Sequence, residues 1–566
     1  MQEMPGASRL IVRLGLLVLA SWLLWVGFKI YPAAATRVMW LPVVFGAYLA
    51  AFGSLLGAAA LRKRQEHIAR LWILIATLAG VVAWFAVEVT AYYPQYRADT
   101  LALSHVAAQE MLRGGNPYAL ESADVIQEVE RLGIPRSLLT QTTDGKPFAR
   151  VVAYPALHFV VFVPALAAGV DDLRWVVLMF ELLALLILWR STPRRFQPLA
   201  FVPFLVNPDL LVIFTSGLTD WLWVTPLMLA AVSLTRGHTF LAGVAYGCAT
   251  AVKQLPWVAL PFLVIWLLKS RQKGASFPAA AMFLGTATMT FFAANMPFIV
   301  LDPGAWAQGV MTPLFAPLVL DGHGLSTLSR VGWLPDSQLL YGGLTAVAVL
   351  IAVAAYWRFF PWLRDALWIF PAVLMWVAYR SFHNCILYWL PPIYLWVLLD
   401  PAKRLARTQA SRGAPMARPA PVSRVGLGFI GALLVVLVVS FTARIGPATS
   451  SSGPIEVRVI AVSARADPLV IDTITVEVTN RTPSPIEPVF TVMRAGQSVV
   501  WPIETGPAAL AAGAAAVYGI AAPAGASGLP PRNLYAGEAG SGGEPMLLRV
   551  TARGTDAAAN VWIPGF

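Results

Sequence analysis

Charged residues are scarce in this chain of 566 residues. They make up 12% of the sequence, whereas a soluble globular domain carries about 25%. Hydrophobic residues reach 58%, and they gather in repeated apolar runs of about 20 residues, the length that an α-helix needs to span a hydrocarbon core. These runs are too long and too uniformly apolar for barrel strands. The composition therefore predicts an α-helical membrane protein.

Cysteine is almost absent. Cys248 and Cys385 both fall in apolar segments, so they offer neither a disulfide framework nor the spacing of a Cys-rich zinc site. The sequence has no Gly-x-x-x-x-Gly-Lys-Ser/Thr loop and no His-Glu-x-x-His motif, which argues against an ATP-driven pump and a zinc protease. It also lacks the Asp-x-Asp pair of metal-dependent nucleotide-sugar transferases. We therefore expect no metal and no other cofactor.

The net charge of +12 comes from Lys and Arg residues that concentrate in short segments between the apolar runs. This distribution follows the positive-inside rule and makes nucleic-acid binding a poor explanation. Residues 62–64, 269–273 and 403–424 are the most basic segments, and we expect them in the cytoplasm. The polar segments 92–150 and 301–336 then lie on the opposite, outer side.

The basic segment 190–195 creates a conflict in this topology. If residues 151–170 cross the membrane, the segment is exported, against the rule. If residues 151–170 instead lie along the outer interface, as Pro155 and Pro164 suggest, the segment is cytoplasmic. Residues 240–268 then form two short helices whose tip, near Lys253 and Pro256, points outward. We favour the second arrangement.

We therefore predict an α-helical polytopic membrane protein with about 12–13 transmembrane helices. Residues 1–70 form an N-terminal transmembrane hairpin, with the first apolar run retained rather than cleaved as a signal peptide. Residues 71–400 form the core, with outer loops 92–172 and 301–336, and residues 401–424 form a basic cytoplasmic linker. The expected helices are 14–31, 39–61, 71–91, 173–190, 198–216, 218–235, 277–300, 337–356, 365–380, 384–399 and, after the linker, 425–442.

The character of the sequence changes after the last apolar run. Residues 450–566 contain alternating segments, such as 455–459 and 473–478, separated by clusters of Gly, Pro and Ser. This pattern is typical of an all-β sandwich domain. The topology places it outside the membrane. Its acidic residues are scattered and form no triad or metal cluster, so we expect an accessory that handles the acceptor rather than a part of the reaction centre. The alternative is a module that only stabilises the outer loops or binds another envelope protein.

Asp99 follows an apolar span at the outer surface, where a carboxylate can deprotonate a hydroxyl arriving from water. Taken alone, the more ordinary explanation is that Asp99 caps the helix expected at 101–113. Lys253 lies in an apolar stretch, where a lysine costs roughly 2.5–3.5 kcal/mol, so its presence favours a polar cavity or helix tip. Snorkelling of the side chain to the interface is the rival explanation.

A string of short motifs adds to this reading. After Asp99 come Gly115-Asn116-Pro117-Tyr118 and Tyr154-Pro155, then Asn207-Pro208-Asp209, Gly217-Leu218-Thr219-Asp220, Leu241-Ala242-Gly243 and Arg380-Ser381-Phe382-His383-Asn384. Over residues 71–400 this pattern resembles glycosyltransferase family 87, in the C superfamily of polyprenyl-phosphate-sugar-dependent glycosyltransferases. Leu218 stands where that family often has Gln.

The resemblance implies an integral membrane glycosyltransferase of the plasma (inner) membrane, with its active site on the extracytoplasmic face. Asp99 would be the general base for an acceptor hydroxyl, which displaces polyprenyl phosphate from the sugar with inversion. Lys253, Arg380 and His383 would bind the donor phosphate. The expected substrate-binding residues are Tyr96, Arg97, Asn116, Tyr118, Tyr154, Asp220 and His323.

The residues themselves leave other roles open. Asp220 can be a second carboxylate of the site or an N-cap, Arg380 and His383 can be interfacial anchors, and His323 can be an ordinary loop histidine. Mannose is the favoured sugar and arabinofuranose the next, with a glycolipid or cell-envelope polysaccharide as acceptor. The alternatives are a transporter or flippase for lipid-linked saccharides, which would show internal repeats that we do not find, and a scaffold that presents the sandwich.

Overall fold

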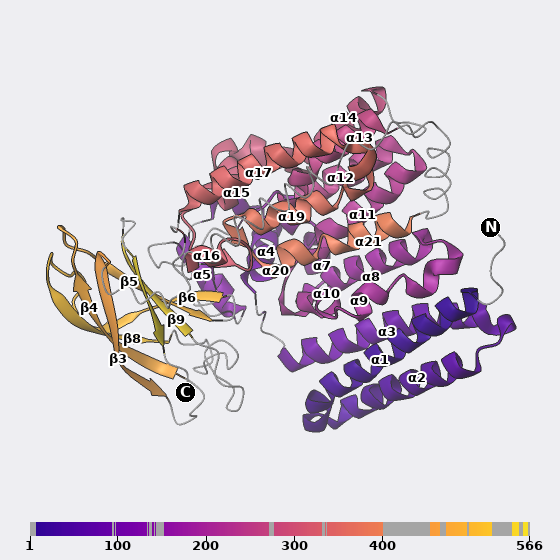
Figure 1. Ribbon diagram of the computed structural model, residues 1–566, viewed down its shortest axis with the longest axis horizontal. Coiled ribbons are helices and arrows are strands. Elements are labelled where there is room, and N and C mark those ends of the chain that lie inside the picture. The colour runs from indigo at the N-terminus through magenta and orange to yellow at the C-terminus, as the bar shows by residue number, and fades with distance from the viewer. Residues whose placement is uncertain are drawn as a thin grey trace.

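The protein is a helical body with a β-sandwich at one end, as the computed structural model in Figure 1 shows. This confirms the predicted fold class of a mostly helical chain with C-terminal antiparallel sheets. The structure describes residues 7–92, 96, 98–120, 122–132, 134, 139–140, 142, 152–270, 277–330, 334, 337–399, 453–464, 471–494, 497–522, 546–553 and 558–563. The linker 401–424 and the expected helix 425–442 lie outside these residues.

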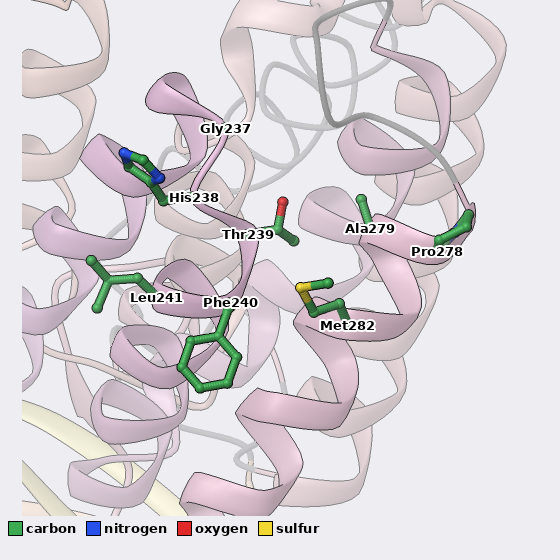
Figure 2. A pocket seen from close by; sticks show the side chains of 8 residues that line it. All are labelled: Gly237, His238, Thr239, Phe240, Leu241, Pro278, Ala279 and Met282. Carbon is green, nitrogen blue, oxygen red and sulfur yellow. The ribbon is translucent and has the colours of Figure 1, made fainter.

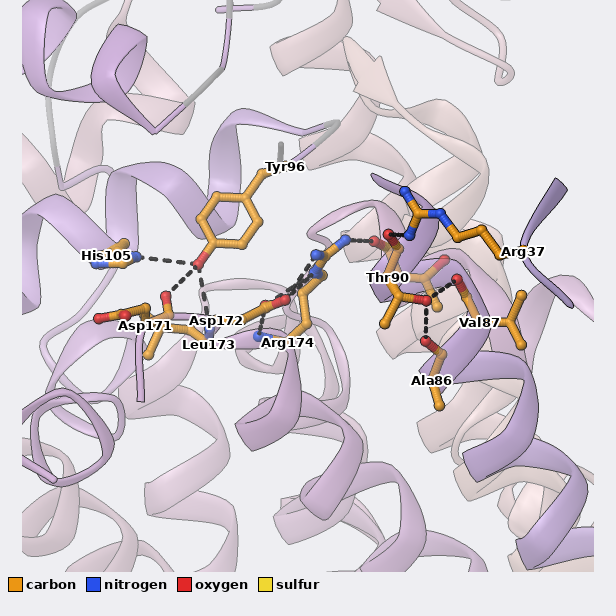
Figure 3. A network of polar contacts seen from close by, with 11 residues as sticks. Arg37, Ala86, Val87, Thr90, Tyr96, His105, Asp171, Asp172, Leu173 and Arg174 are labelled. Atoms are coloured by element: carbon orange, nitrogen blue, oxygen red, sulfur yellow. Dashed lines mark hydrogen bonds and ion pairs between the residues drawn. The ribbon is translucent and has the colours of Figure 1, made fainter. Parts of the chain in front are cut away.

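The long helices lie side by side in the order α2, α1, α3, α8, α11, α12 and α14 (Figure 1). Helices α1 (Ala7–Thr36) and α2 (Leu41–Ala60) form the predicted N-terminal hairpin, and α1 also packs against α3 (Glu66–Tyr92). Trp25 and Trp84 stack between α1 and α3 with ring centroids 5.0 Å apart. Arg37, in the turn after α1, donates to the carbonyl of Thr90 at 2.7 Å and so ties the hairpin to the end of α3 (Figure 3).

Five helices in the described part of the chain are long and apolar enough to cross a membrane by themselves: α1, α2, α3, α14 (Phe277–Leu301) and α17 (Gln338–Arg358). Helix α8 (Arg174–Ser191) has 18 residues but carries Arg174, Glu181 and Arg190. Helix α11 (Trp221–Arg236) has only 16 residues. Among the described residues, therefore, only some of the expected 12–13 crossings are single long helices.

Proline explains the clearest failure of the helix prediction. Residues 198–216, expected as one helix, divide into η5 (Arg194–Leu199), α9 (Val202–Leu205), α10 (Asp209–Val212) and η6 (Ile213–Ser216). Pro198, Pro203 and Pro208 recur every five residues, and each removes a backbone donor and prevents the helix from continuing. The expected helices 365–380 and 384–399 are likewise short: α18 (Phe360–Leu363), η8 (Arg364–Ala366), α19 (Ile369–Val377), α20 (His383–Leu387) and α21 (Leu390–Leu398).

The described residues of loop 92–172, the first of the two loops that we predict to be outside, are mostly helical. The loop contains α4 (Asp99–Leu112), η3 (Pro117–Ala119) and α5 (Ser122–Arg131), followed by α6 (Leu157–Val160) and α7 (Val163–Ala167). The stretch from Leu157 to Ala167 is apolar, but its 11 residues cover only about 16 Å as a helix, half the thickness of a hydrocarbon core. Residues 151–170 are therefore too short and broken to cross a membrane as a helix, which supports the interfacial arrangement.

Helix α12 (Thr239–Val252) ends at Lys253, and η7 (Leu255–Ala259) and α13 (Leu260–Lys269) lead back. Two glycines one turn apart press α12 against α14. A Cβ on Gly243 would lie 2.6 Å from the carbonyl of Phe283, and one on Gly247 would lie 2.6 Å from that of Ala287. Small residues at this spacing let two membrane helices approach closely.

The second outer loop contains α15 (Pro303–Phe315), the two-residue strand β1 (Asp321–Gly322) and α16 (Thr327–Arg330). Strand β1 pairs in parallel with β2 (Arg380–Ser381), which joins this loop to the segment between α19 and α20. An isolated bridge between Thr142 and Leu318 joins the two outer loops.

The C-terminal domain consists of two four-stranded antiparallel sheets, with strand orders β10-β9-β5-β6 and β3-β4-β8-β7. One core, which includes Ile474, Val476, Phe490 and Val550, lies between them. The strands are β3 (Ile455–Ala464), β4 (Ile471–Asn480), β5 (Pro488–Arg494), β6 (Gln497–Trp501), β7 (Ile503–Thr505), β8 (Ala515–Ala521), β9 (Met546–Ala552) and β10 (Ala558–Ile563).

The first prediction concerns the contact between α12 and α14. Replacing Gly247 with alanine overpacks this contact and should lower the free energy of unfolding by about 1–3 kcal/mol. Gly285 provides the matched control, because a Cβ there meets nothing within 4 Å. Unfolding in detergent should show a loss for Gly247→Ala and none for Gly285→Ala. Equal behaviour of the two variants would mean that the helices are not packed at this glycine.

The second prediction concerns orientation. In a variant with serine in place of Cys248 and Cys385, a cysteine at exposed Asp124 in α5 should react with an impermeant thiol reagent outside the cell. A cysteine at exposed Arg194 should react only after the cytoplasmic side is opened, since basic segments stay inside. Labelling of position 194 from outside would place the 190–195 segment on the exported side and contradict this topology.

Candidate active site

Three elements that are distant in the sequence meet at one end of the helical body. Gly217, at a φ of +107°, lies against the start of α4, where an added Cβ would be 3.4 Å from the carbonyl oxygen of Ala98. This close contact brings the turn before α11 alongside Asp99. The end of α12 reaches the same place through Lys253, which contacts Asp220. The motifs around Asp99, Asp220 and Lys253 are therefore neighbours in space.

Lys253 and Asp220 form a buried ion pair. The Lys253 ammonium donates to Asp220 Oδ1 at 2.7 Å, and the two residues are 7% and 0% exposed. Asp220 also accepts from the indole N–H of Trp223 and, at Oδ2, from the side-chain amide of Asn384, each at 2.8 Å. A buried charge is tolerated only when it is paired and hydrogen-bonded in this way. Asp220 makes no side-chain N-cap hydrogen bond to α11.

Tyr154 lies near both this ion pair and Asp99. The Lys253 ammonium is 5.4 Å from the centroid of the Tyr154 ring, and the imidazole of His158 stacks on the ring with centroids 4.1 Å apart. Burial raises the pKa of the Tyr154 phenol. The charge of Lys253 opposes this rise, while the carboxylates of Asp99 and Asp220 add to it. Asp99 and Asp220 are therefore both close enough to Tyr154 to influence the pKa of its hydroxyl.

His158 is neutral in this setting. Burial, together with the nearby charge of Lys253, lowers its pKa to about 3. Its Nδ1 lies 3.2 Å from the carbonyl oxygen of Val252 and its Nε2 lies 3.4 Å from the hydroxyl of Thr219. A neutral ring that bonds to both α12 and the turn before α11 supports Tyr154 without adding charge.

The backbone around Tyr154 is held by three polar side chains. The Tyr118 hydroxyl donates to the carbonyl of Tyr154 at 2.9 Å, and the Gln254 amide donates to the carbonyls of Ala153 and Val310 at 2.9 and 2.6 Å. Asn295 Oδ1 of α14 accepts from the backbone N–H of Ala156 at 2.9 Å. The tip at residues 253–254 therefore packs against both loops that we predict to be outside, while the side of the membrane on which it lies stays a prediction.

Asp99 is half-buried and does not cap α4. Its Oδ2 accepts from the backbone N–H and the hydroxyl of Thr140 at 3.0 and 2.9 Å, and its Oδ1 accepts from the Thr100 hydroxyl at 3.3 Å. The N-cap position belongs to Ala98. The helix-cap explanation is therefore wrong. The carboxylate is oriented by Thr140, in the same loop segment as Thr142, which bridges to the second outer loop.

The β1–β2 pair brings His323 and His383 together. Both residues are exposed, and their rings lie edge to face with centroids 5.4 Å apart. The backbone N–H of His323 donates to the carbonyl of Ser381 at 2.7 Å. Arg380 lies in the same strand pair, with its guanidinium 5.0 Å from the Phe382 ring centroid. Asn384, the residue after His383, binds Asp220. The segment that carries Arg380 and His383 therefore lies next to the buried ion pair.

Three of the predicted substrate-binding residues are instead buried by partners within the protein. Tyr96 is 4% exposed, and its hydroxyl, 3.1 Å from His105 Nδ1, also donates to the carbonyl of Asp171 at 3.3 Å (Figure 3). Tyr118 is buried against Phe159 and Phe298 and positions the Tyr154 backbone. Asp220 is fully buried by its partners.

The remaining predicted residues have mixed outcomes. Asn116 accepts from the backbone N–H of Tyr118 at 3.2 Å and so forms the turn at the start of η3. Arg97 lies outside the described residues. The structure brings Asp99, Tyr154 and Lys253 into one cluster, with His383 adjoining it through Asn384 and His323 adjoining His383.

A hollow in the surface lies away from this cluster. It has a volume of about 680 Å³ and is lined by Gly237, His238, Thr239, Phe240, Leu241, Pro278, Ala279 and Met282 (Figure 2). These residues include the turn that joins the C-terminus of α11 to the N-terminus of α12, while Asp220 and Lys253 lie at the other ends of these helices. A helix of 16 residues spans about 24 Å, so the hollow is not the candidate site.

Several residues of the site escaped the sequence analysis. Asn295 and His158 each lie in an apolar segment, and a polar side chain in such a segment is a signal that it faces the protein interior. Asn384 follows His383 in a motif that was noted, but the partner that explains it, Asp220, is 164 residues away. Thr140 carries no pattern that would reveal its contact with Asp99.

The chain is similar to alpha-(1->6)-mannopyranosyltransferase A of Mycobacterium tuberculosis (strain ATCC 25618 / H37Rv). The two are 28% identical over 313 residues, which cover 50% of this chain and 57% of the relative. The match thus spans little more than half of the relative's length. No protein-family model matches the chain. Together with the membrane helices, the similarity is consistent with a membrane glycosyltransferase.

The third prediction tests the buried ion pair. Asp220→Asn or Lys253→Met alone leaves one charge buried without its partner and should cost roughly 3–5 kcal/mol of unfolding free energy. The double variant should cost clearly less than the sum of the two, which a double-mutant cycle measures in mixed micelles. The control pair is Arg553 and Glu487 in the sandwich, 46% and 55% exposed, whose coupling should be about 0–1 kcal/mol. Additive losses at positions 220 and 253 would contradict the pairing.

Proposed function

We propose that this protein is an integral membrane mannosyltransferase that uses a polyprenyl-phosphate sugar as donor and acts on the outer face of the plasma (inner) membrane. The observation that carries the proposal is the cluster in which Asp99 and the buried Lys253–Asp220 pair both lie near Tyr154. The similarity to a mannopyranosyltransferase supports a sugar transferase and favours mannose over arabinofuranose.

In this proposal Asp99 is the general base. One of its oxygens is occupied by two hydrogen bonds from Thr140, and the other accepts one long bond at 3.3 Å from Thr100. The latter oxygen retains a lone pair for the proton of an acceptor hydroxyl. That hydroxyl attacks the anomeric carbon as the bond to the phosphate oxygen breaks, so the sugar is transferred with inversion.

The leaving group needs cationic partners, because negative charge grows on the phosphate oxygen in the transition state. Lys253 has given one of its three N–H donors to Asp220, and the remaining donors can reach a phosphate. Asp220 balances the charge of Lys253. In this proposal, therefore, Arg380 and the protonated form of His383 supply the net positive charge that faces the phosphate. His323, edge-on to His383, is placed to contact the sugar or the phosphate.

The proposed partners follow from the same geometry. The membrane helices hold the protein in the bilayer, where the polyprenyl chain of the donor dissolves. The outer loops present Asp99 to an acceptor that arrives from the aqueous side. We propose a glycolipid or cell-envelope polysaccharide as that acceptor. We propose that the Tyr154 ring contacts the substrate, because it lies close to the Lys253 ammonium.

A transporter or flippase for lipid-linked saccharides is the second candidate, since broken helices around buried charge also occur in carriers. The two differ in their products. Reconstituted protein supplied with a polyprenyl-phosphate mannose and an acceptor should release polyprenyl phosphate and form a new glycoside. Movement of intact donor between leaflets without a new glycoside would favour the carrier.

The fourth prediction is that Asp99→Asn loses roughly 10²–10⁴-fold of the transfer rate, the contribution expected of a general base. The amide oxygen still accepts from Thr140, so the variant should insert and unfold as the wild type does. Asp124→Asn, at an exposed acid on α5 in the same outer loop, is the control and should keep full activity. Turnover by Asp99→Asn near that of the wild type would remove Asp99 from the mechanism.

A further inference from the structure

The C-terminal sandwich has an outward face that is buried. Along β9, Leu548 and Val550 point into the sandwich core, so the intervening residues point to the other side of the sheet. Yet Leu547 and Arg549 are 5% and 7% exposed, and Thr491, paired with Arg549 on β5, is 5% exposed. We call Thr491, Leu547 and Arg549 the docking face. Its burial means that another part of the chain covers it.

The second outer loop provides part of that cover. Arg549 Nη1 donates to the carbonyl of Ser329 at 3.3 Å, and β6 lies against β1. Figure 1 shows β6 and β9 on the side of the sandwich nearest to α16. Ser329 belongs to the last turn of α16, where the carbonyls have no partner within the helix and accept readily from an arginine. The sequence had suggested that the sandwich is separate from the reaction centre. The structure shows that it contacts the second outer loop.

The contact continues from α16 to the histidine pair. The Ser329 hydroxyl lies 2.6 Å from that of Tyr341, which also donates to the carbonyl of Leu325 at 3.4 Å. The backbone N–H of Leu325 donates to the carbonyl of Trp376 at 2.8 Å, and that of His323 donates to Ser381. Residues 321–330 thus form one hydrogen-bonded segment, with Arg549 at one end and His323, facing His383, at the other.

This segment packs closely on β2, and the contact buries polar groups. Gly322, at a φ of +134° that glycine adopts without strain, lies against the backbone of Ser381. The hydroxyls of Ser326 and Ser381 are buried without a hydrogen-bond partner among the residues that the structure describes, which costs free energy. A segment of this kind needs support from outside, and the sandwich is in position to give it.

We propose that Arg549 is a positioning residue for the donor-phosphate site, which acts by holding segment 321–330 so that His323 orients His383. This inference rests on the proposed function, because it takes His383 as a phosphate ligand. The sandwich is then a part that completes the donor site, in addition to any contact that it makes with an acceptor.

The test uses the full-length protein in nanodiscs and two readouts. Backbone hydrogen exchange of residues 321–330 reports docking, and the affinity for polyprenyl phosphate, without any sugar transfer, reports the phosphate site. Arg549→Ala should raise exchange in this segment and weaken binding at least about fivefold, the lower end of typical coupling between separate sites. Arg549→Lys keeps a cationic N–H donor and should restore part of both. Arg553 follows the last residue of β9 and forms an exposed ion pair with Glu487. The control variant Arg553→Ala should change neither readout.

The outcomes separate this inference from the proposed function. If His383→Ala binds polyprenyl phosphate as the wild type does, the phosphate assignment fails, whatever exchange shows. If His383→Ala weakens binding while Arg549→Ala raises exchange without weakening it, docking is real but the positioning role is wrong. Unchanged exchange in Arg549→Ala would contradict the docking itself. If Arg549→Ala fails to fold, Arg549→Gln replaces it in the test, because glutamine keeps an uncharged N–H donor. This variant should show an intermediate rise in hydrogen exchange of residues 321–330, and no rise would overturn the inference.

Discussion

The buried ion pair between Lys253 and Asp220 is the constraint on which the rest of the site depends. Two opposite charges at 2.7 Å in an apolar interior must stay together, because separating them would leave either one buried without a partner. The pair therefore joins the end of α12 to the beginning of α11. Helix α12 ends at Val252, and the extended backbone of Lys253 leads the chain into η7, where Pro256 prevents the helix from continuing. Asn384 then attaches the segment that carries His383 to the same carboxylate.

Around this fixed centre, the outer loops supply groups that face water. Asp99 is half-buried and held by Thr140, whereas His323 and His383 are exposed and follow the two paired strands β1 and β2. In the proposed function, the Lys253–Asp220 pair, Arg380 and His383 serve the lipid-linked leaving group, and Asp99 serves the acceptor. Among the described residues, the sandwich contacts the loop segment that carries His323, through Arg549 and β6.

The sequence was informative wherever a single segment carries its own signal. Apolar length predicted α1, α2, α3, α14 and α17, and alternation predicted the sandwich. Asp99 and Lys253 stood out because charge at the end of a span or within an apolar run is costly. The sequence was less informative where distant partners decide. Tyr96 and Asp220 have the residue types of substrate ligands, but His105, Lys253 and Asn384 bind and bury them. Periodicity likewise did not reveal that Pro198, Pro203 and Pro208 divide an apolar run into short pieces.

The most direct test of the central claim is a structure of the protein with polyprenyl phosphate bound in a lipid nanodisc. The account predicts density for the phosphate within hydrogen-bonding distance of the Lys253 ammonium and beside Arg380 and His383, with Asp99 on the other side of the space left for the sugar. Phosphate density at the far ends of α11 and α12, near His238 and Met282, or density that leaves the Lys253–Asp220 pair without contact, would contradict it.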